Sequence, residues 1–77
     1  MNKARRKELD KASELIAQAQ EIVQGAADEE QEYFDGAPEN MVESDKYARA
    51  EEAAGELIEI ADELSEHLDR IETAKYE

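Results

Sequence analysis

The chain has 77 residues, enough for one small domain, and it carries 22 Asp and Glu against nine Lys and Arg, a formal net charge of −13. It holds no cysteine, which excludes a disulfide framework, a thiol nucleophile and a cysteine-ligated metal. Strong acidity disfavours direct binding to nucleic acid or to an anionic membrane. No apolar run approaches the roughly 18–20 residues of a membrane span, and none follows the basic N-terminus as in a secretory signal. We therefore expect a cytoplasmic protein.

The first part of the chain alternates polar and apolar residues at helical spacing. Two apolar series repeat every seven residues, and a third pair widens the stripe to a breadth typical of a core-facing helix. This pattern predicts a helix over about residues 3–34, in which Gly25 is either a weak point or harmless. The series are Leu9, Ile16 and Val23; Ala12, Ala19, Ala26 and Tyr33; and Leu15 with Ile22.

A turn-rich segment follows over about residues 35–44. Asp35-Gly36 is a typical turn pair, and Pro38 cannot continue a helix from the preceding turn. Pro38 can instead begin a short helical turn that runs through Met41 and Val42. Ser44 is then in the position of an N-cap for the next helix.

The remaining residues predict a second helix over about residues 45–75. Its apolar residues again repeat every seven positions, and Glu and Asp fill the opposite face. Two helices with one short connection make an antiparallel hairpin, so we expect an all-α fold. The series are Tyr47, Ala54, Ala61 and Leu68; Ala50, Leu57, Leu64 and Ile71; and Ala53, Ile60, His67 and Ala74.

The charge is divided unevenly along the chain. Residues 1–11 have a net charge of +3 and residues 12–77 a net charge of −16, and no Lys or Arg interrupts the eight acids between Asp28 and Asp45. In an antiparallel hairpin the basic residues 3–7 lie beside the acidic end of the second helix, including Glu66, Asp69 and Glu72. We therefore predict charge pairing at the open end of the hairpin, or a separate contact there for an acidic partner.

The apolar stripes are wider than one two-helix seam needs. A single seam uses two positions of each heptad, and each stripe here is three positions wide. The extra width at Leu15, Ile22, Ile58 and Ile60 predicts a second covering surface. We expect a homodimer that forms a four-helix bundle, or a target protein that takes the place of the second copy.

Catalytic patterns are weak, and we expect no catalytic residue, no cofactor and no metal. Ser65, His67 and Asp69 are two apart on a helix, so they face different directions and cannot form a triad. Glu63 and His67 share a helical face, but two ligands are too few for a metal, and a di-iron motif fails because residue 64 is Leu.

One enzyme class remains as an alternative. Helical nucleotide pyrophosphohydrolases hold magnesium with a Glu-Glu-x-x-Glu helix and a later Glu-x-x-Asp helix. Residues 28–32 (Asp-Glu-Glu-Gln-Glu) approximate the first element, and residues 59–62 (Glu-Ile-Ala-Asp) fit the second. In a chain this acidic, such matches also arise by chance.

The connection and the end of the first helix form the predicted binding site. A rigid acidic rod can mimic nucleic acid and occupy a basic groove, although a solvated helical face gives the same composition. The neighbouring aromatic residues either fill the closed end of the core or anchor a partner. The predicted partner-binding residues are Glu29, Glu30, Glu32, Tyr33, Phe34, Asp35, Glu39 and Glu43.

The segment Phe34-Asp35-Gly36-Ala37-Pro38-Glu39 resembles a group of short acidic proteins encoded by tailed phages and prophages. Their pattern is an acidic run, then Phe-Asp-Asn-x-Pro-Glu-Ser, then an acidic amphipathic helix. This chain departs from it at Gly36 and Asn40, and its opening residues 2–7 also resemble theirs.

The resemblance implies a phage context but transfers no activity. Small acidic phage proteins often block host defence or modify host enzymes. We therefore expect a non-enzymatic protein of the bacterial host cytoplasm that binds and inhibits a larger host protein with a basic surface, such as a nucleic-acid-binding or immune-defence complex. The alternative is a structural or assembly accessory subunit.

Overall fold

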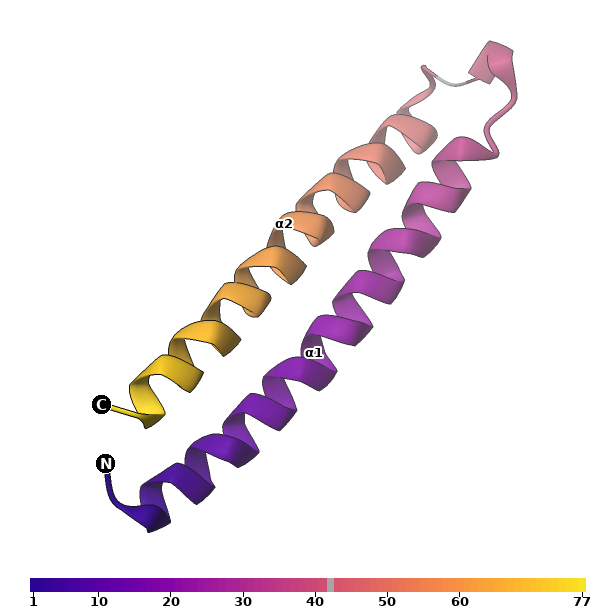
Figure 1. Cartoon of the computed structure of the whole chain (residues 1–77). Helices are drawn as coiled ribbons and strands as arrows, with labels where there is room; N and C mark the ends of the chain where they lie inside the picture. Colours follow the sequence, from indigo (N-terminus) through magenta and orange to yellow (C-terminus); the bar gives the residue numbers. More distant parts are fainter. Residues whose placement is uncertain (42) are drawn as a thin grey trace.

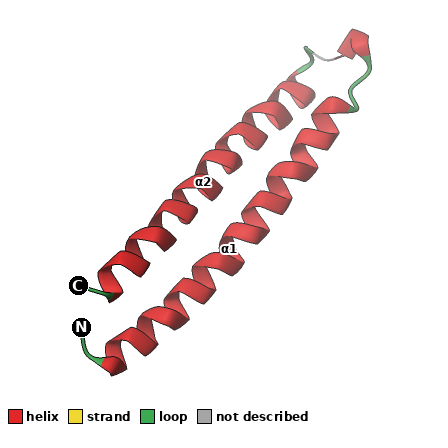
Figure 2. Ribbon diagram, in the orientation of Figure 1, coloured by secondary structure: helices red, strands yellow, loops and turns green. Residues whose placement is uncertain are grey.

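The protein is an antiparallel hairpin of two long helices, as predicted. The computed structural model describes residues 1–41 and 43–77, so the part of the predicted helical turn at Val42 lies outside the described residues. The elements are α1 (Lys3–Asp35), a short 3-10 helix (Glu39–Met41) and α2 (Asp45–Lys75). The helices lie side by side along their whole length, with both termini at one end of a rod whose Cα extents are 59 × 16 × 13 Å (Figures 1 and 2).

Local signals place the helix ends within one or two residues of the predicted bounds. Asn2 caps α1, because its Oδ1 accepts a 2.8 Å hydrogen bond from the backbone N–H of Arg5. α1 closes where the N–H of Gly36 donates to the carbonyl of Glu32 at 3.0 Å. Ser44 occupies the N-cap of α2 as predicted, although its side chain makes no capping hydrogen bond. α1 runs unbroken through Gly25, which is therefore harmless to the helix.

The two helices meet along one row of residues in each, spaced alternately three and four apart. Every residue of these rows is buried or half-buried, which is the pattern of a heptad seam. The rows are Leu9, Ser13, Ile16, Gln20, Val23, Ala27, Glu30 and Phe34 in α1, and Tyr47, Ala50, Ala54, Leu57, Ala61, Leu64, Leu68, Ile71 and Lys75 in α2.

One apolar series of α1 does not face the seam. Ala19 and Ala26 are exposed, and the row that ends at Phe34 takes their place. The physical reason is that one helix cannot turn both rows toward the same partner. The observed rotation buries Ala27 and half-buries Phe34, while it leaves the hydroxyl-bearing Tyr33 near the surface.

The core is thin. Among the described residues, the buried apolar side chains are four alanines (Ala27, Ala50, Ala54 and Ala61), and no large side chain is fully buried. The leucines and isoleucines of the seam are covered on one side only. In residues 1–41 and 43–77, neither helix has the length and apolar character needed to cross a membrane.

The alanine contacts predict that the seam will not accept a larger residue. Ala61 is 0% exposed, so Ala61→Leu forces the helices apart and lowers the free energy of unfolding by about 1–3 kcal/mol. Each kcal/mol corresponds to a fall in Tm of roughly 4–8 °C for a chain of this size. Thermal unfolding followed by circular dichroism measures this change. The control is Ala4→Leu, at an exposed position of α1. Equal Tm values for the two variants would contradict the close packing of Ala61 in the seam.

Candidate functional site

The predicted partner-binding residues all lie at the closed end of the hairpin, which we call the tip (residues 28–45). Their acids come from the last two turns of α1 and from the connection (Figure 1). Five of them are exposed, and Glu30 is half-buried because it lies in the seam row. The exposed acids are Glu29, Glu32, Asp35, Glu39 and Glu43.

Two of the aromatic side chains at the closed end of the hairpin, Tyr33 and Tyr47, contact each other. The rings of Tyr33 and Tyr47 stack with centroids 5.0 Å apart, and Phe34 is half-buried in the seam. This arrangement fills the closed end of the core, which is the first of the two predicted roles. Tyr33 keeps 40% of its surface exposed, so it is the aromatic residue at the tip that a partner can also reach.

A cation lies against these rings. The Nζ atom of Lys46 is 5.6 Å from the ring centroid of Tyr33 and 5.9 Å from that of Tyr47, within the range of a cation–π contact. Hydrogen bonding with Tyr33 and then the charge interactions with both tyrosines raise the pKa of Lys46 above its ordinary value. This contact could not be predicted from the sequence, because it depends on which tyrosines the hairpin brings together.

The carboxylates at the tip carry no ion pair among the described residues. Gln24 and Gln31 donate amide hydrogen bonds to Asp28 and Asp35 at 3.1 and 3.0 Å, which orient the carboxylates without neutralising them. Both ion pairs of the described chain lie at the opposite end of the rod. The negative potential of the tip is therefore compensated only by Lys46 at its edge.

The open end pairs its charges differently from the prediction. The ammonium of Lys75 contacts the carboxylates of Asp10 and Glu72, so a base of α2 binds an acid of α1. Among the described residues, Arg6 pairs with no acid. Its Nε donates to the carbonyl oxygen of Lys75 at 3.0 Å, and its guanidinium lies 5.9 Å from the ring centroid of Tyr76.

The position of Lys75 explains this arrangement. Lys75 belongs to the seam row and is buried, so its ammonium reaches Asp10 across the interface. The terminal carbonyls of α2 lack helical partners and carry partial negative charge, which attracts Arg6. Hydrogen bonds to Asp10 and then to Glu72 raise the pKa of Lys75, against a smaller opposing effect of burial.

The geometry does not bring the hydrolase-like acids together. The stack of Tyr33 on Tyr47 and the contact of Asp10 with Lys75 fix the register of the hairpin. In that register, residues 28–32 and residues 59–62 are separated by roughly 13 Å along the rod, at 1.5 Å per residue. Within residues 1–41 and 43–77, no group of three or more acidic or histidine side chains is arranged to hold a metal.

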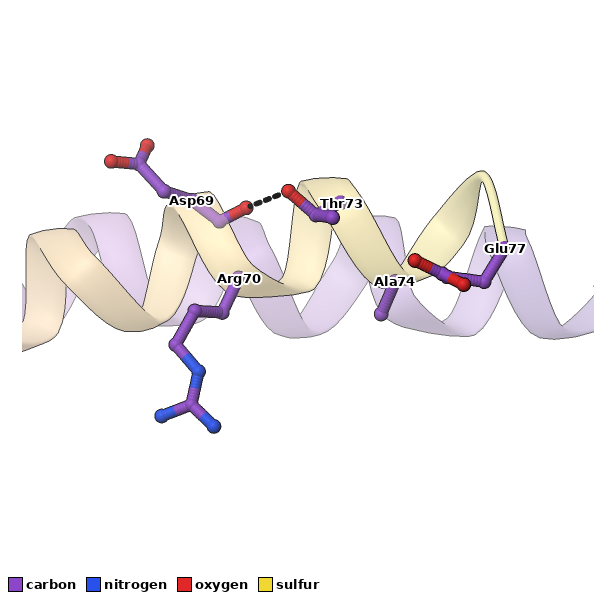
Figure 3. Close-up of a pocket in the computed structure, with 5 residues that line it drawn as sticks. All are labelled: Asp69, Arg70, Thr73, Ala74 and Glu77. Carbon is purple, nitrogen blue, oxygen red and sulfur yellow. Dashed lines mark hydrogen bonds between the residues drawn. The ribbon is translucent and has the colours of Figure 1, made fainter.

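Two surface hollows lie near the open end. The first is lined by Asp69, Arg70, Thr73, Ala74 and Glu77. Figure 3 shows that the side chains of Asp69 and Arg70 project to opposite sides, while the hydroxyl of Thr73 donates to the carbonyl of Asp69 at 3.1 Å. Because its polar groups do not converge, this hollow lacks the arrangement of a small-molecule site.

The second hollow crosses the seam. It is lined by Ile16 of α1 and by four residues of α2, which are His67, Arg70, Ile71 and Ala74. His67 is thus an exposed residue at an apolar edge of the hairpin. This edge continues along the rod as an exposed apolar surface.

The four residues that widen the stripes are exposed, as the width of the pattern predicts. Leu15 and Ile22 of α1 keep 57% and 74% of their surface accessible, and Ile58 and Ile60 of α2 keep 39% and 37%.

A comparison of the chain with family models, curated proteins and solved structures found no match. The charge and geometry of these surfaces are therefore the basis for assigning a function.

The contacts of Lys75 predict a pH-dependent contribution to stability. Lys75→Met keeps the apolar stem but removes the ammonium, so we expect a lower free energy of unfolding at neutral pH. Since the pKa is raised in the folded state, the contribution is complete below the ordinary lysine value of 10.5 and is lost as the pH rises through the folded-state pKa. Urea unfolding of both chains at pH 7 and at alkaline pH measures the difference.

The control for this prediction is Lys7→Met, which removes an exposed lysine at the same end of the rod. Its free energy of unfolding should stay close to that of the unaltered chain. A difference between Lys75→Met and the unaltered chain that persists or grows at alkaline pH is incompatible with the ion pairs described here.

Proposed function

We propose that this chain is a non-enzymatic binding protein of phage type, which acts in the bacterial host cytoplasm. It places its acidic tip on the basic surface of a larger host protein and inhibits that protein by competing with nucleic acid. A nucleic-acid-binding or immune-defence complex is the class of target that this chemistry fits. The tip residues named above are the contact surface, and no cofactor takes part.

The observation that carries the proposal is the uncompensated charge of the tip. Eight acids fall between Asp28 and Asp45 with no Lys or Arg among them. The ion pairs of the described residues lie at the far end. A stability role does not account for this arrangement, because like charges at helical spacing repel one another and lower helix stability.

The spacing of the acids supports charge mimicry. Twenty-two acids along a rod of 59 Å give roughly one per 2.7 Å, against one phosphate per roughly 1.7 Å of DNA axis. The bases reduce the net density, but they are concentrated at the open end, so the local field at the tip remains close to the gross value. Such a field steers a negatively charged rod toward a basic groove.

The proposed active form is a homodimeric four-helix bundle. Exposed Leu15 and Ile22 support it, since a soluble monomer has little reason to present two large apolar residues one heptad apart. The same observation favours a second candidate function, a structural or assembly accessory subunit. Recovery of the chain in purified phage particles, with no host protein bound, would favour that alternative.

Neutralising the tip should abolish capture of the target. The test variant carries Glu→Gln at residues 29, 32, 39 and 43, and it is used as bait in a bacterial lysate beside the unaltered chain. We expect the unaltered chain to retain a defined protein at 50 mM salt. At 200 mM salt its affinity should fall by about 10³-fold, if about six charges are neutralised on binding. The tip variant should retain none of that protein at either salt concentration.

The matched control carries Glu→Gln at residues 51, 52, 59 and 66, which removes the same charge from exposed positions of α2. It should still bind the protein at 50 mM salt. Equal loss in both variants would mean that total charge, rather than the tip, determines binding. Capture that ignores salt would contradict charge mimicry altogether.

A further inference from the structure

One side of the hairpin presents a continuous apolar surface that neither helix covers. Its α1 part is the row of Ala12, Leu15, Ala19, Ile22 and Ala26, whose spacing alternates between three and four as in the seam. We call this row and the α2 series described next the outer face. Four of its five α1 residues are exposed, namely Leu15, Ala19, Ile22 and Ala26, and Ala12 is half-buried.

The structure fixes which residues of α2 lie on the same side. Tyr33 continues the outer row of α1, and Lys46 of α2 lies over its ring. At the other end, His67 and Ala74 of α2 share a hollow with Ile16 of α1. Residues one heptad apart occupy the same side of a helix, so the α2 part of the outer face is Ala53, Ile60, His67 and Ala74.

The opposite side of the hairpin is polar. It contains the ion pairs of Asp10 and Glu72 with Lys75. Ile58 belongs to the same heptad position as Glu72, so it lies on this polar side although it is only two residues from Ile60. The two exposed isoleucines of α2 therefore project from opposite sides of the rod.

The α1 part of the outer face lies in a segment that carries few charges. Residues 11–27 include one lysine and two glutamates, in a protein with a net charge of −13. Two copies of such an acidic chain repel one another wherever their acids meet. A segment with little charge and two exposed apolar residues is the region where a second copy can approach.

We propose that the outer face binds the outer face of a second copy, turned end for end about a two-fold axis level with Ala19. This inference deepens the proposed dimeric form by assigning its interface and orientation. The rotation places Ala12 opposite Ala26 and Ala19 opposite itself, and it brings Leu15 within one residue of the level of Ile22. Every large apolar residue of the α1 row then meets another apolar residue.

The same axis fits α2 without adjustment. The α2 series pairs Ala53 with Ala74 and Ile60 with His67 about a midpoint between Glu63 and Leu64. The contacts of Tyr33 with Tyr47 and of Asp10 with Lys75 place residues 61–66 of α2 level with Ala19. Both halves of the outer face thus have their midpoints at one level of the rod, as a single two-fold axis requires.

The charges at both ends of the interface are complementary in this orientation. The basic residues 3–7 of one copy lie beside the acidic residues 31–35 of the other. At the α2 edge, Arg49 lies opposite Glu77 and Arg70 lies opposite Glu56. Glu63 meets its own copy at the outer edge, where water screens the repulsion.

The available surface is large enough for a stable dimer. One whole side of the rod, with Cα extents of 59 and 16 Å, presents roughly 900 Å² when the charged ends that flank the outer face are included, and a specific interface needs about 800 Å² per partner. The interface occupies one side of each rod, so the two tips lie at opposite ends of the dimer. The basic residues 3–7 of the other copy lie beside residues 31–35 of each tip, so the part of the tip that remains accessible to a target is the connection with Glu39 and Glu43.

The two isoleucines of α2 give a matched test. Ile60→Glu puts a charge into the interface, and we expect the dissociation constant of the dimer to rise at least about tenfold. Ile58→Glu makes the same chemical change at a residue of nearly equal exposure on the polar side, and should leave the dimer unchanged. Sedimentation equilibrium measures both, with helicity checked by circular dichroism. Monomeric unaltered protein, or equal loss in both variants, would overturn the proposal.

A cysteine placed on the axis tests the orientation, since the native chain has none. Ala19→Cys should form a covalent dimer with a short bis-maleimide, whereas Gly55→Cys, at an exposed residue away from the outer face, should not. A mixture of Ala12→Cys and Ala26→Cys chains should give mainly the mixed product. Mainly self-linked products would show a parallel dimer. None of these measurements involves the target. The dimer proposal can therefore fail while binding of the tip to a target holds, and binding of the tip can fail while the dimer forms.

Discussion

The contact between α1 and α2 is lined by alanine where it is tightest. Ala27, Ala50, Ala54 and Ala61 allow the helices to approach closely, and the larger seam residues lie to either side of them, half-covered. A close seam buries little apolar area, and about 25 cal/mol per Å² of buried apolar surface is the main favourable term in folding. The hairpin thus combines a well-defined geometry with a small core, as expected of a chain this short.

The segregation of charge follows from that constraint. Apart from the half-buried Glu30, the acids lie outside the rows that form the seam and the outer face, because a charge there would be poorly solvated once those rows are covered. They collect on the remaining faces and at the tip. The basic N-terminal residues lie where α2 ends, and Arg6 donates there to the carbonyl oxygen of Lys75. The result is a rod with a strongly negative tip, an apolar side with little charge and a paired open end. The tip is suited to a basic partner, and the apolar side to another copy of the chain.

Heptad spacing was sufficient to predict both helices, while the turn and cap residues indicated their bounds and the single short connection indicated their antiparallel order. It could not decide which alanine row of α1 faces α2, because the rows that end at Tyr33 and Phe34 are almost equally apolar. Contact with α2 determines which row of α1 faces the seam, and the sequence of α1 alone does not contain that information. For the same reason the cation–π contact of Lys46 and the burial of Lys75 were missed. The predicted acids of the tip are close in sequence, so their proximity could be predicted without the register between α1 and α2.

We propose that a second copy covers the outer face and that the stability of the hairpin depends on this contact. The dependence of Tm on protein concentration tests it most directly, because a folded state that requires association gains stability as concentration rises. Thermal unfolding of the unaltered chain across a hundredfold range of concentration should show a Tm that rises steadily. A Tm that stays constant over that range would mean that the hairpin folds alone with its outer face open to water, and it would contradict this account.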